Sequence, residues 1–155
     1  TVMIFTRQDV PDLGGEDRKA QAALTRRGGY VLKQTGAPDS RPDIILVADG
    51  SEVSLLCEVA DMLAKEGVNV RVVSVPSIGL FLRQDKEYRD SVIPEGIKMF
   101  GLTAGVPSTL YPIMRGDWKV FGLQRFGASA PYKVLDEKFG FTPDNILTEI
   151  KHFLH

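Results

Sequence analysis

The fold is decided by one uninterrupted segment, DIILVADGSEVSLLCEVADMLAKEG, which occupies residues 43–67. Its first part, from Ile44 to Ala48, is a continuous apolar run, which is typical of a strand covered on both faces. Apolar residues then recur at helical spacing until Gly67, and Ser51 or the glycine before it is expected to cap the helix. A buried strand that leads through a tight turn into an amphipathic helix is the repeating unit of an α/β domain.

The same alternation continues along the chain. Further strands are expected at residues 30–32, 70–75, 98–103 and 120–123, and further helices at residues 84–92, 129–139 and 142–154. A strand end at residues 2–6 and a polar loop that reaches Gly29 are expected before them. This order predicts an α/β domain around a largely parallel sheet with right-handed crossovers.

Composition limits the number of domains and excludes several classes of function. The chain has 155 residues, a net charge of −1, 43% hydrophobic residues and 25% charged residues, which fits one globular domain. This charge leaves no electrostatic footprint for nucleic acid or an anionic membrane, and no apolar run approaches the ~18 residues of a membrane span. Cys57 is the only cysteine, which excludes an intrachain disulfide and fits a reducing cytosol. The chain starts at Thr1 without a signal region, so we expect a piece of a longer protein.

The residues that usually carry catalysis do not converge in this sequence. His152 and His155 are the only histidines, and we expect both to be solvated at a helix end. There is no cluster of His, Cys, Asp and Glu at metal-ligand spacing, and no Gly-x-Ser-x-Gly elbow for a nucleophilic serine. Cys57 lies in an apolar helical pattern and is expected to be a small buried hydrophobe. We therefore assign no catalytic, cofactor-binding or metal-binding residue.

The turn Asp49-Gly50-Ser51 has two interpretations. It joins a buried strand to a helix, where free backbone N–H groups attract phosphate. However, it lacks the further glycines of a dinucleotide fingerprint and the lysine of a phosphate loop, and Asp49 and Glu52 place negative charge there. A structural turn is favoured over a ligand site.

Two aromatic positions could mark a partner surface. Tyr88 and Arg89 are adjacent, and the favoured interpretation lies within the domain: a ring packed on the sheet and a guanidinium held by a carboxylate or carbonyl. Trp118 is expected in a turn, with its ring packed against a neighbouring domain rather than a ligand.

Seven stretches follow the order and spacing of one known family. They are FTRQDVP (5–11), RGGYVL (27–32), GSEV (50–53), RVVSVPS (71–77), QDKEYRDSVIP (84–94), RFGASAP (125–131) and FGFT (139–142). Through them nearly the whole chain resembles the C-terminal domain of a transketolase. The pyruvate dehydrogenase β-subunit and deoxyxylulose-phosphate synthase share the fold, but the run at 84–94 is not expected in them.

The resemblance implies a three-layer α/β/α sandwich with about five strands, one of them antiparallel. Residues 1–27 would be the end of the middle, pyrimidine-binding domain and a linker, and residues 28–155 the C-terminal domain. The intact enzyme would be a cytoplasmic homodimer of the pentose phosphate pathway that moves a two-carbon ketol group from a ketose phosphate to an aldose phosphate. Thiamine diphosphate and a divalent metal, Mg²⁺ or Ca²⁺, would be held by other domains. This chain would then be a non-catalytic, structural and dimer-supporting module.

One site residue follows from the resemblance. Arg7 matches a family arginine that contacts the phosphate end of the sugar substrate, a role that suits the planar fork of a guanidinium.

Two departures from the family pattern keep other functions open. Family members usually have Thr where Asp49 stands and Val-Glu-Ala-Gly where this chain has LTAG at residues 102–105, and residues 107–118 diverge as well. The alternatives are a sister enzyme such as dihydroxyacetone synthase, or a stand-alone small-molecule or nucleotide-binding regulatory module that uses the turn at residues 49–51.

Overall fold

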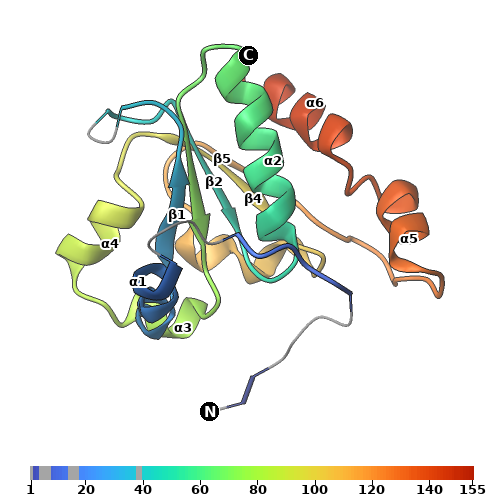
Figure 1. Ribbon diagram of the computed structural model, residues 1–155, viewed down its shortest axis with the longest axis horizontal. Coiled ribbons are helices and arrows are strands. Elements are labelled where there is room, and N and C mark those ends of the chain that lie inside the picture. The colour runs from blue at the N-terminus through green and yellow to red at the C-terminus, as the bar shows by residue number, and fades with distance from the viewer. Residues whose placement is uncertain (1, 4–7, 14–17, 38–39) are drawn as a thin grey trace.

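The computed structural model describes residues 2–3, 8–13, 18–37 and 40–155. Its centre is a five-stranded sheet with the order β1-β3-β2-β4-β5 (Figure 1). The strands are β1 (Tyr30–Gln34), β2 (Ile44–Ala48), β3 (Val70–Ser74), β4 (Lys98–Leu102) and β5 (Trp118–Phe121). β1 pairs antiparallel with β3, and the other pairs are parallel. The predicted α/β sheet with one antiparallel strand is confirmed.

Helices cover both faces of this sheet (Figure 1). They are α1 (Arg18–Ala23), α2 (Glu52–Lys65), α3 (Ile78–Leu82), α4 (Lys86–Val92), α5 (Tyr132–Phe139) and α6 (Pro143–Leu154). Short 3₁₀ turns are η1 (Leu24–Arg27), η2 (Pro107–Thr109) and η3 (Tyr111–Ile113). α2 and α6 pack side by side on one face, whereas α3 and α4 lie on the other.

The central strand β2 explains the three layers. All five of its residues are fully buried. Alternate side chains of a strand point to opposite faces of the sheet, and here each face is covered by a core. Ile44 and Leu46 enter the core beneath α2 and α6, whereas Ile45 and Val47 enter the core beneath α3 and α4. A single apolar run therefore supplies both cores.

Several local predictions were wrong. The expected loop before Gly29 contains α1 and η1, because its RKAQAA segment is rich in good helix formers. β5 begins at Trp118, which was expected in a turn. Ser51 is the N-cap residue of α2, as predicted, but its side chain makes no capping hydrogen bond, since its hydroxyl donates to Glu52 Oε1. In the expected strand end, residues 2–3 have no regular structure and residues 4–6 lie outside the described part of the chain.

Candidate functional site

The candidate site lies at the carboxyl ends of β2 and β4. The chain leaves β2 for β3 on one side of the sheet and later returns as β4 on the other side of β2. Ligands of open α/β sheets commonly bind where the strand order reverses in this way. The turn at residues 49–51 follows β2, and Thr103 and Ala104 follow β4. The sequence analysis considered only the turn after β2, which is one half of this site.

Two adjoining hollows open there, of about 320 and 280 Å³. They share residues of the turn after β2, of α5 and of the N-terminal segment; Gln8, Ser51, Glu52, Tyr132, Asp136 and Phe141 line both. Asp9 and Glu58 add two more carboxylates to the larger hollow, and among the described residues neither lining contains a Lys or Arg. We call the two hollows together the acidic crevice.

Glu52 ties the two strand ends together across the crevice. One carboxylate oxygen, Oε1, accepts a hydrogen bond of 2.7 Å from the Ser51 hydroxyl. The other, Oε2, accepts one of 3.3 Å from the backbone N–H of Ala104. Because Ala48 pairs with Leu102, the next residues Asp49 and Thr103 end neighbouring strands. Asp49, where the family usually has Thr, and Thr103, where it usually has Glu, therefore lie at the ends of neighbouring strands.

Two carboxyl groups that line the crevice, those of Glu52 and Asp136, and the neighbouring one of Asp49 have raised pKa values. Burial raises the pKa of Asp49, Glu52 and Asp136 above their ordinary values. For Glu52 the negative charge of Asp49 raises the pKa further, while the hydrogen bonds from Ser51 and Ala104 offset part of the effect. Asp49 Oδ1 is buried and has no hydrogen-bond partner among the described residues.

This chemistry disfavours an anionic ligand at the turn. A phosphate needs free N–H donors and positive potential, but Glu52 already occupies the Ala104 N–H and the lining carries carboxylates. The diphosphate of a thiamine cofactor does not fit this crevice for the same reason. Within the described ranges no group of three or more His, Cys, Asp or Glu side chains could hold a metal ion. The same ranges contain no helix long and apolar enough to cross a bilayer.

Tyr88 is half-buried and packs against the core within the domain. Its hydroxyl donates a hydrogen bond of 2.8 Å to the carbonyl oxygen of Gly29, and its ring meets Phe81 edge-on with 6.4 Å between centroids. The guanidinium carbon of Arg27 lies 4.3 Å from the centre of the ring. The run at residues 84–94 thus fastens α4 to the segment before β1. The expected position of the Tyr88 ring inside the domain is confirmed, but its hydrogen bond and ring contacts are with Gly29, Phe81 and Arg27.

Arg89 was expected to be held by a carboxylate or a carbonyl, and the structure does not show this. Its Nε is buried, with no hydrogen-bond partner in the part of the chain that the structure describes. The guanidinium that holds this region is that of Arg115, which contacts Asp90 at 2.6 Å and the carbonyl of Ile93 at 3.3 Å. Arg115 lies 25 residues from Asp90 in the sequence, so no local pattern could indicate the pair.

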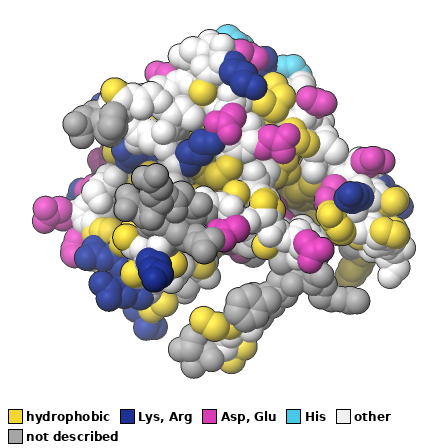
Figure 2. Space-filling view, in the orientation of Figure 1, with side chains coloured by type: hydrophobic (Ala, Val, Ile, Leu, Met, Phe, Trp, Pro, Cys, Tyr) yellow, Lys and Arg dark blue, Asp and Glu magenta, His cyan; other side chains and the backbone are white. Residues whose placement is uncertain are grey.

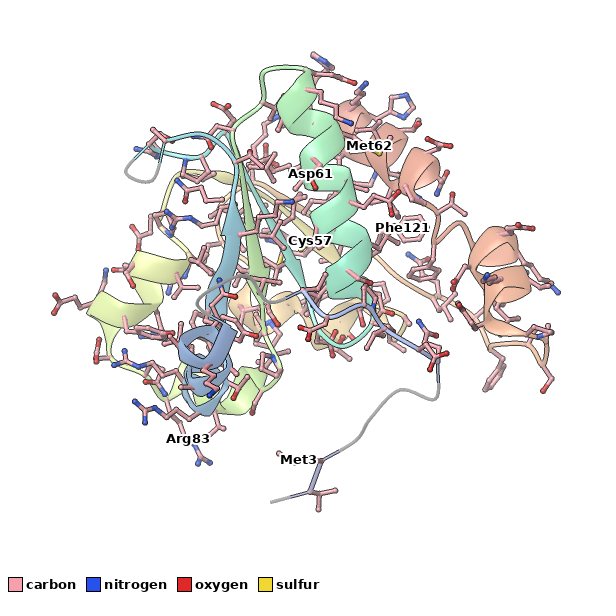
Figure 3. All side chains as sticks on the ribbon, in the orientation of Figure 1. Met3, Cys57, Asp61, Met62, Arg83 and Phe121 are labelled. Carbon is pink, nitrogen blue, oxygen red and sulfur yellow. The ribbon has the colours of Figure 1, made fainter. Side chains whose placement is uncertain are left out.

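The remaining candidates lie apart from the crevice. Cys57 is buried, burial raises the pKa of its thiol, and it lies with Asp61 on the side of α2 that faces β1 (Figure 3). His152 and His155 are exposed, as predicted. The ring of Trp118 packs against Tyr111, with centroids 4.9 Å apart, and remains 38% exposed. Arg7 lies outside the described residues, so its role stays a prediction.

Comparison with known proteins shows the family to which the chain belongs. The sequence profile described as the transketolase-like TK C-terminal domain matches residues 28–142. The chain belongs to this family. This transketolase-like chain is 44% identical over 156 residues to Transketolase 1 of Pasteurella multocida, which covers 99% of the chain and 23% of that relative. The chain thus spans less than a quarter of the length of the curated relatives it matches.

Solved structures agree with this family. A transketolase of Leishmania mexicana superposes with a TM-score of 0.74 at 34% identity, over 85% of this chain and 18% of that one. A transketolase of Pichia stipitis gives a TM-score of 0.77 at 31% identity, over 96% of this chain and 20% of that one. The predicted family and three-layer fold are confirmed.

Two features of the site escaped sequence reasoning. Asp136 lines both hollows with Glu52 although 84 positions separate them in the sequence. Glu52 was noticed only as a charge unfavourable to phosphate, whereas it bridges the ends of β2 and β4. Asp49 and the missing glutamate in the LTAG stretch were the two signals that the chemistry of this edge differs from the family pattern.

Proposed function

We propose that this chain serves as the structural and dimer-supporting C-terminal domain of a transketolase. The observation that carries the proposal is the extent of the match: it covers 99% of this chain but only 23% of relatives named transketolase. An acidic crevice that does not fit a diphosphate agrees with a scaffold whose reactive groups lie on other domains.

The proposal includes a division of labour within the longer enzyme. Residues 1–27 form the end of the middle domain and a linker, and residues 28–155 the C-terminal domain. The intact enzyme is a cytoplasmic homodimer of the pentose phosphate pathway that transfers a two-carbon ketol group from a ketose phosphate to an aldose phosphate. Thiamine diphosphate, with Mg²⁺ or Ca²⁺, supplies the carbon nucleophile on domains other than this one.

Titration calorimetry tests the scaffold role directly. Thiamine diphosphate with Mg²⁺ should give no binding heat with the 155-residue chain, whereas the longer polypeptide should bind it and transfer ketol groups. Micromolar binding by the 155-residue chain would contradict the proposal. Lack of transfer by the longer polypeptide, with cofactor bound, would favour another activity for the parent.

Arg7 can be tested separately in the longer polypeptide. Arg7→Ala should raise KM for a phosphorylated ketose about 10- to 100-fold, because a charge-assisted hydrogen bond contributes about 1.5–3 kcal/mol. A ketol donor without a phosphate should be affected little. Arg26→Ala, at an exposed position of η1, serves as the matched control. An equal loss with both donors would refute a phosphate contact.

A further inference from the structure

The net charge of −1 is distributed unevenly along the chain. Residues 18–37 and 68–84 contain seven Lys or Arg residues and no Asp or Glu. The first range covers α1, η1 and β1, and the second covers β3 and α3, so two stretches of one sign meet where η1 contacts α3. Figure 2 shows dark blue side chains gathered at the corner of the molecule where Figure 1 places α1 and α3.

Arg27 and Arg83 lie at this corner. Arg27 is the last residue of η1, and Arg83 follows the last residue of α3. The two elements touch at Gly28 and Leu80, because a Cβ built on Gly28 would lie 2.6 Å from the Cβ of Leu80. Arg83 comes three residues after Leu80, which places both side chains on one face of the helical turn. The two arginines therefore border the same contact, and Figure 3 shows Arg83 at this corner.

The guanidinium groups of both arginines are open to a ligand. Arg27 is half-buried, and its guanidinium carbon lies 4.3 Å from the centre of the Tyr88 ring, which holds the group in place. Arg83 is exposed. Neither arginine forms an ion pair with any residue that the structure describes. Asp85, the acid nearest to Arg83 in the sequence, is used as the cap of α4 and accepts the N–H of Tyr88 at 2.7 Å.

This arrangement has the chemistry that recognises phosphate. A guanidinium donates two parallel hydrogen bonds to phosphate oxygens, and a ring stacked beneath it keeps the planar fork in one orientation. We propose that Arg27 and Arg83 bind the phosphate group of a small molecule at the junction of η1 and α3, here called the arginine surface. This site lies on other elements than the acidic crevice, and it goes beyond the scaffold role because the chain itself holds a ligand.

Titration of the 155-residue chain with inorganic phosphate tests the site. Two charge-assisted contacts give an expected Kd on the order of 1 mM. At 10 mM phosphate the thermal midpoint should therefore be about 3–6 °C higher than in chloride of equal ionic strength. Glycerol 3-phosphate should act as phosphate does, whereas glycerol should have no effect.

Three substitutions separate specific binding from general attraction. Arg83→Gln and Arg27→Gln should each weaken phosphate binding about 10- to 100-fold, because each removes one guanidinium. Arg27→Lys keeps the positive charge but loses the planar fork, so it should weaken binding as well. Arg83→Gln should leave the thermal midpoint in chloride unaltered, since Arg83 is exposed. Lys65→Gln, at an exposed position in the last turn of α2, is the matched control and should bind phosphate as the parent chain does.

An equal rise of the thermal midpoint in the double variant Arg27→Gln/Arg83→Gln would overturn the inference, because phosphate would then act on the protein in general. A response to phosphate that does not saturate by 100 mM would overturn it too, as would a lack of response to glycerol 3-phosphate. Binding in the millimolar range is distinct from the micromolar binding of thiamine diphosphate that contradicts the scaffold role. None of these outcomes depends on ketol transfer by the longer polypeptide, so the two proposals fail or stand separately.

Discussion

Replacing Gly28 by alanine tests the close approach that orients the segment before β1. Gly28 has a φ of 84°, and a Cβ built there would lie 2.3 Å from the backbone N of Phe81 and 2.4 Å from the backbone O of Ser77. Both are backbone atoms of the α3 region, so no side-chain rotation can relieve the contact. The Gly28 carbonyl also accepts a hydrogen bond of 3.0 Å from the N–H of Ser77.

Gly67 provides a matched control. It has nearly the same φ, 85°, but a Cβ there would meet nothing within 4 Å. Gly67→Ala therefore carries only the left-handed conformational penalty of about 1–2 kcal/mol. Gly28→Ala carries that penalty and also the overpacking of two backbone segments, typically about 1–3 kcal/mol. Its total cost is about 2–5 kcal/mol.

The measurement is urea unfolding followed by circular dichroism, with stability taken from the midpoint and slope. Gly28→Ala should unfold at a lower urea concentration than Gly67→Ala. In a thermal scan each kcal/mol corresponds to about 2–4 °C for a chain of this size. If the two variants agree within about 0.5 kcal/mol, the variation usual at surface sites, the reasoning from close contact is refuted.

Two further predictions concern Tyr88 and Asp49. Tyr88→Phe removes the hydrogen bond to the buried carbonyl of Gly29 and should destabilise the chain by about 1–2 kcal/mol in urea unfolding. Tyr132→Phe, at a 41% exposed position, should change stability by less than about 0.5 kcal/mol, and an equal effect of both would show that the Tyr88 bond adds nothing. Burial raises the pKa of Asp49 in the folded chain above its value of about 3.9 in the unfolded chain. The folding stability that its carboxyl group contributes is therefore complete below pH of about 3.9 and is lost as the pH rises through the higher pKa of the folded chain. Asp49→Asn should therefore be more stable than the parent at pH 7 and nearly equal to it at pH 3.5; a difference that does not vary with pH would contradict this sign.

Elements with strong periodicity were predicted well from the sequence. β2 was predicted with its observed bounds, because an uninterrupted apolar run in an α/β chain fits a strand buried on both faces. α6 was marked by Pro143 at its first turn and by an apolar stripe that packs onto the core beneath α2. The end of α4 followed from the proline at position 94.

Weakly patterned segments were predicted less well. α1 has six residues and η1 four, too few for a periodic signal, and their polar composition favoured a loop. The division at residue 27 between a linker and the C-terminal domain stays a prediction. The start of α5 was placed at Ser129, but the helix begins at Tyr132 after Pro131.

Local order along the chain was enough to establish the α/β class, the central strand, the principal helices and the family, because these depend on periodicity and on short motifs read in sequence. The acidic crevice depended on the folded molecule. Glu52, in the first turn of α2, and Asp136, on α5, line the same two hollows because the folded chain brings α5 beside the turn that follows β2. The raised pKa values of their carboxyl groups have the same origin, since burial is a property of the packed structure and not of neighbouring letters.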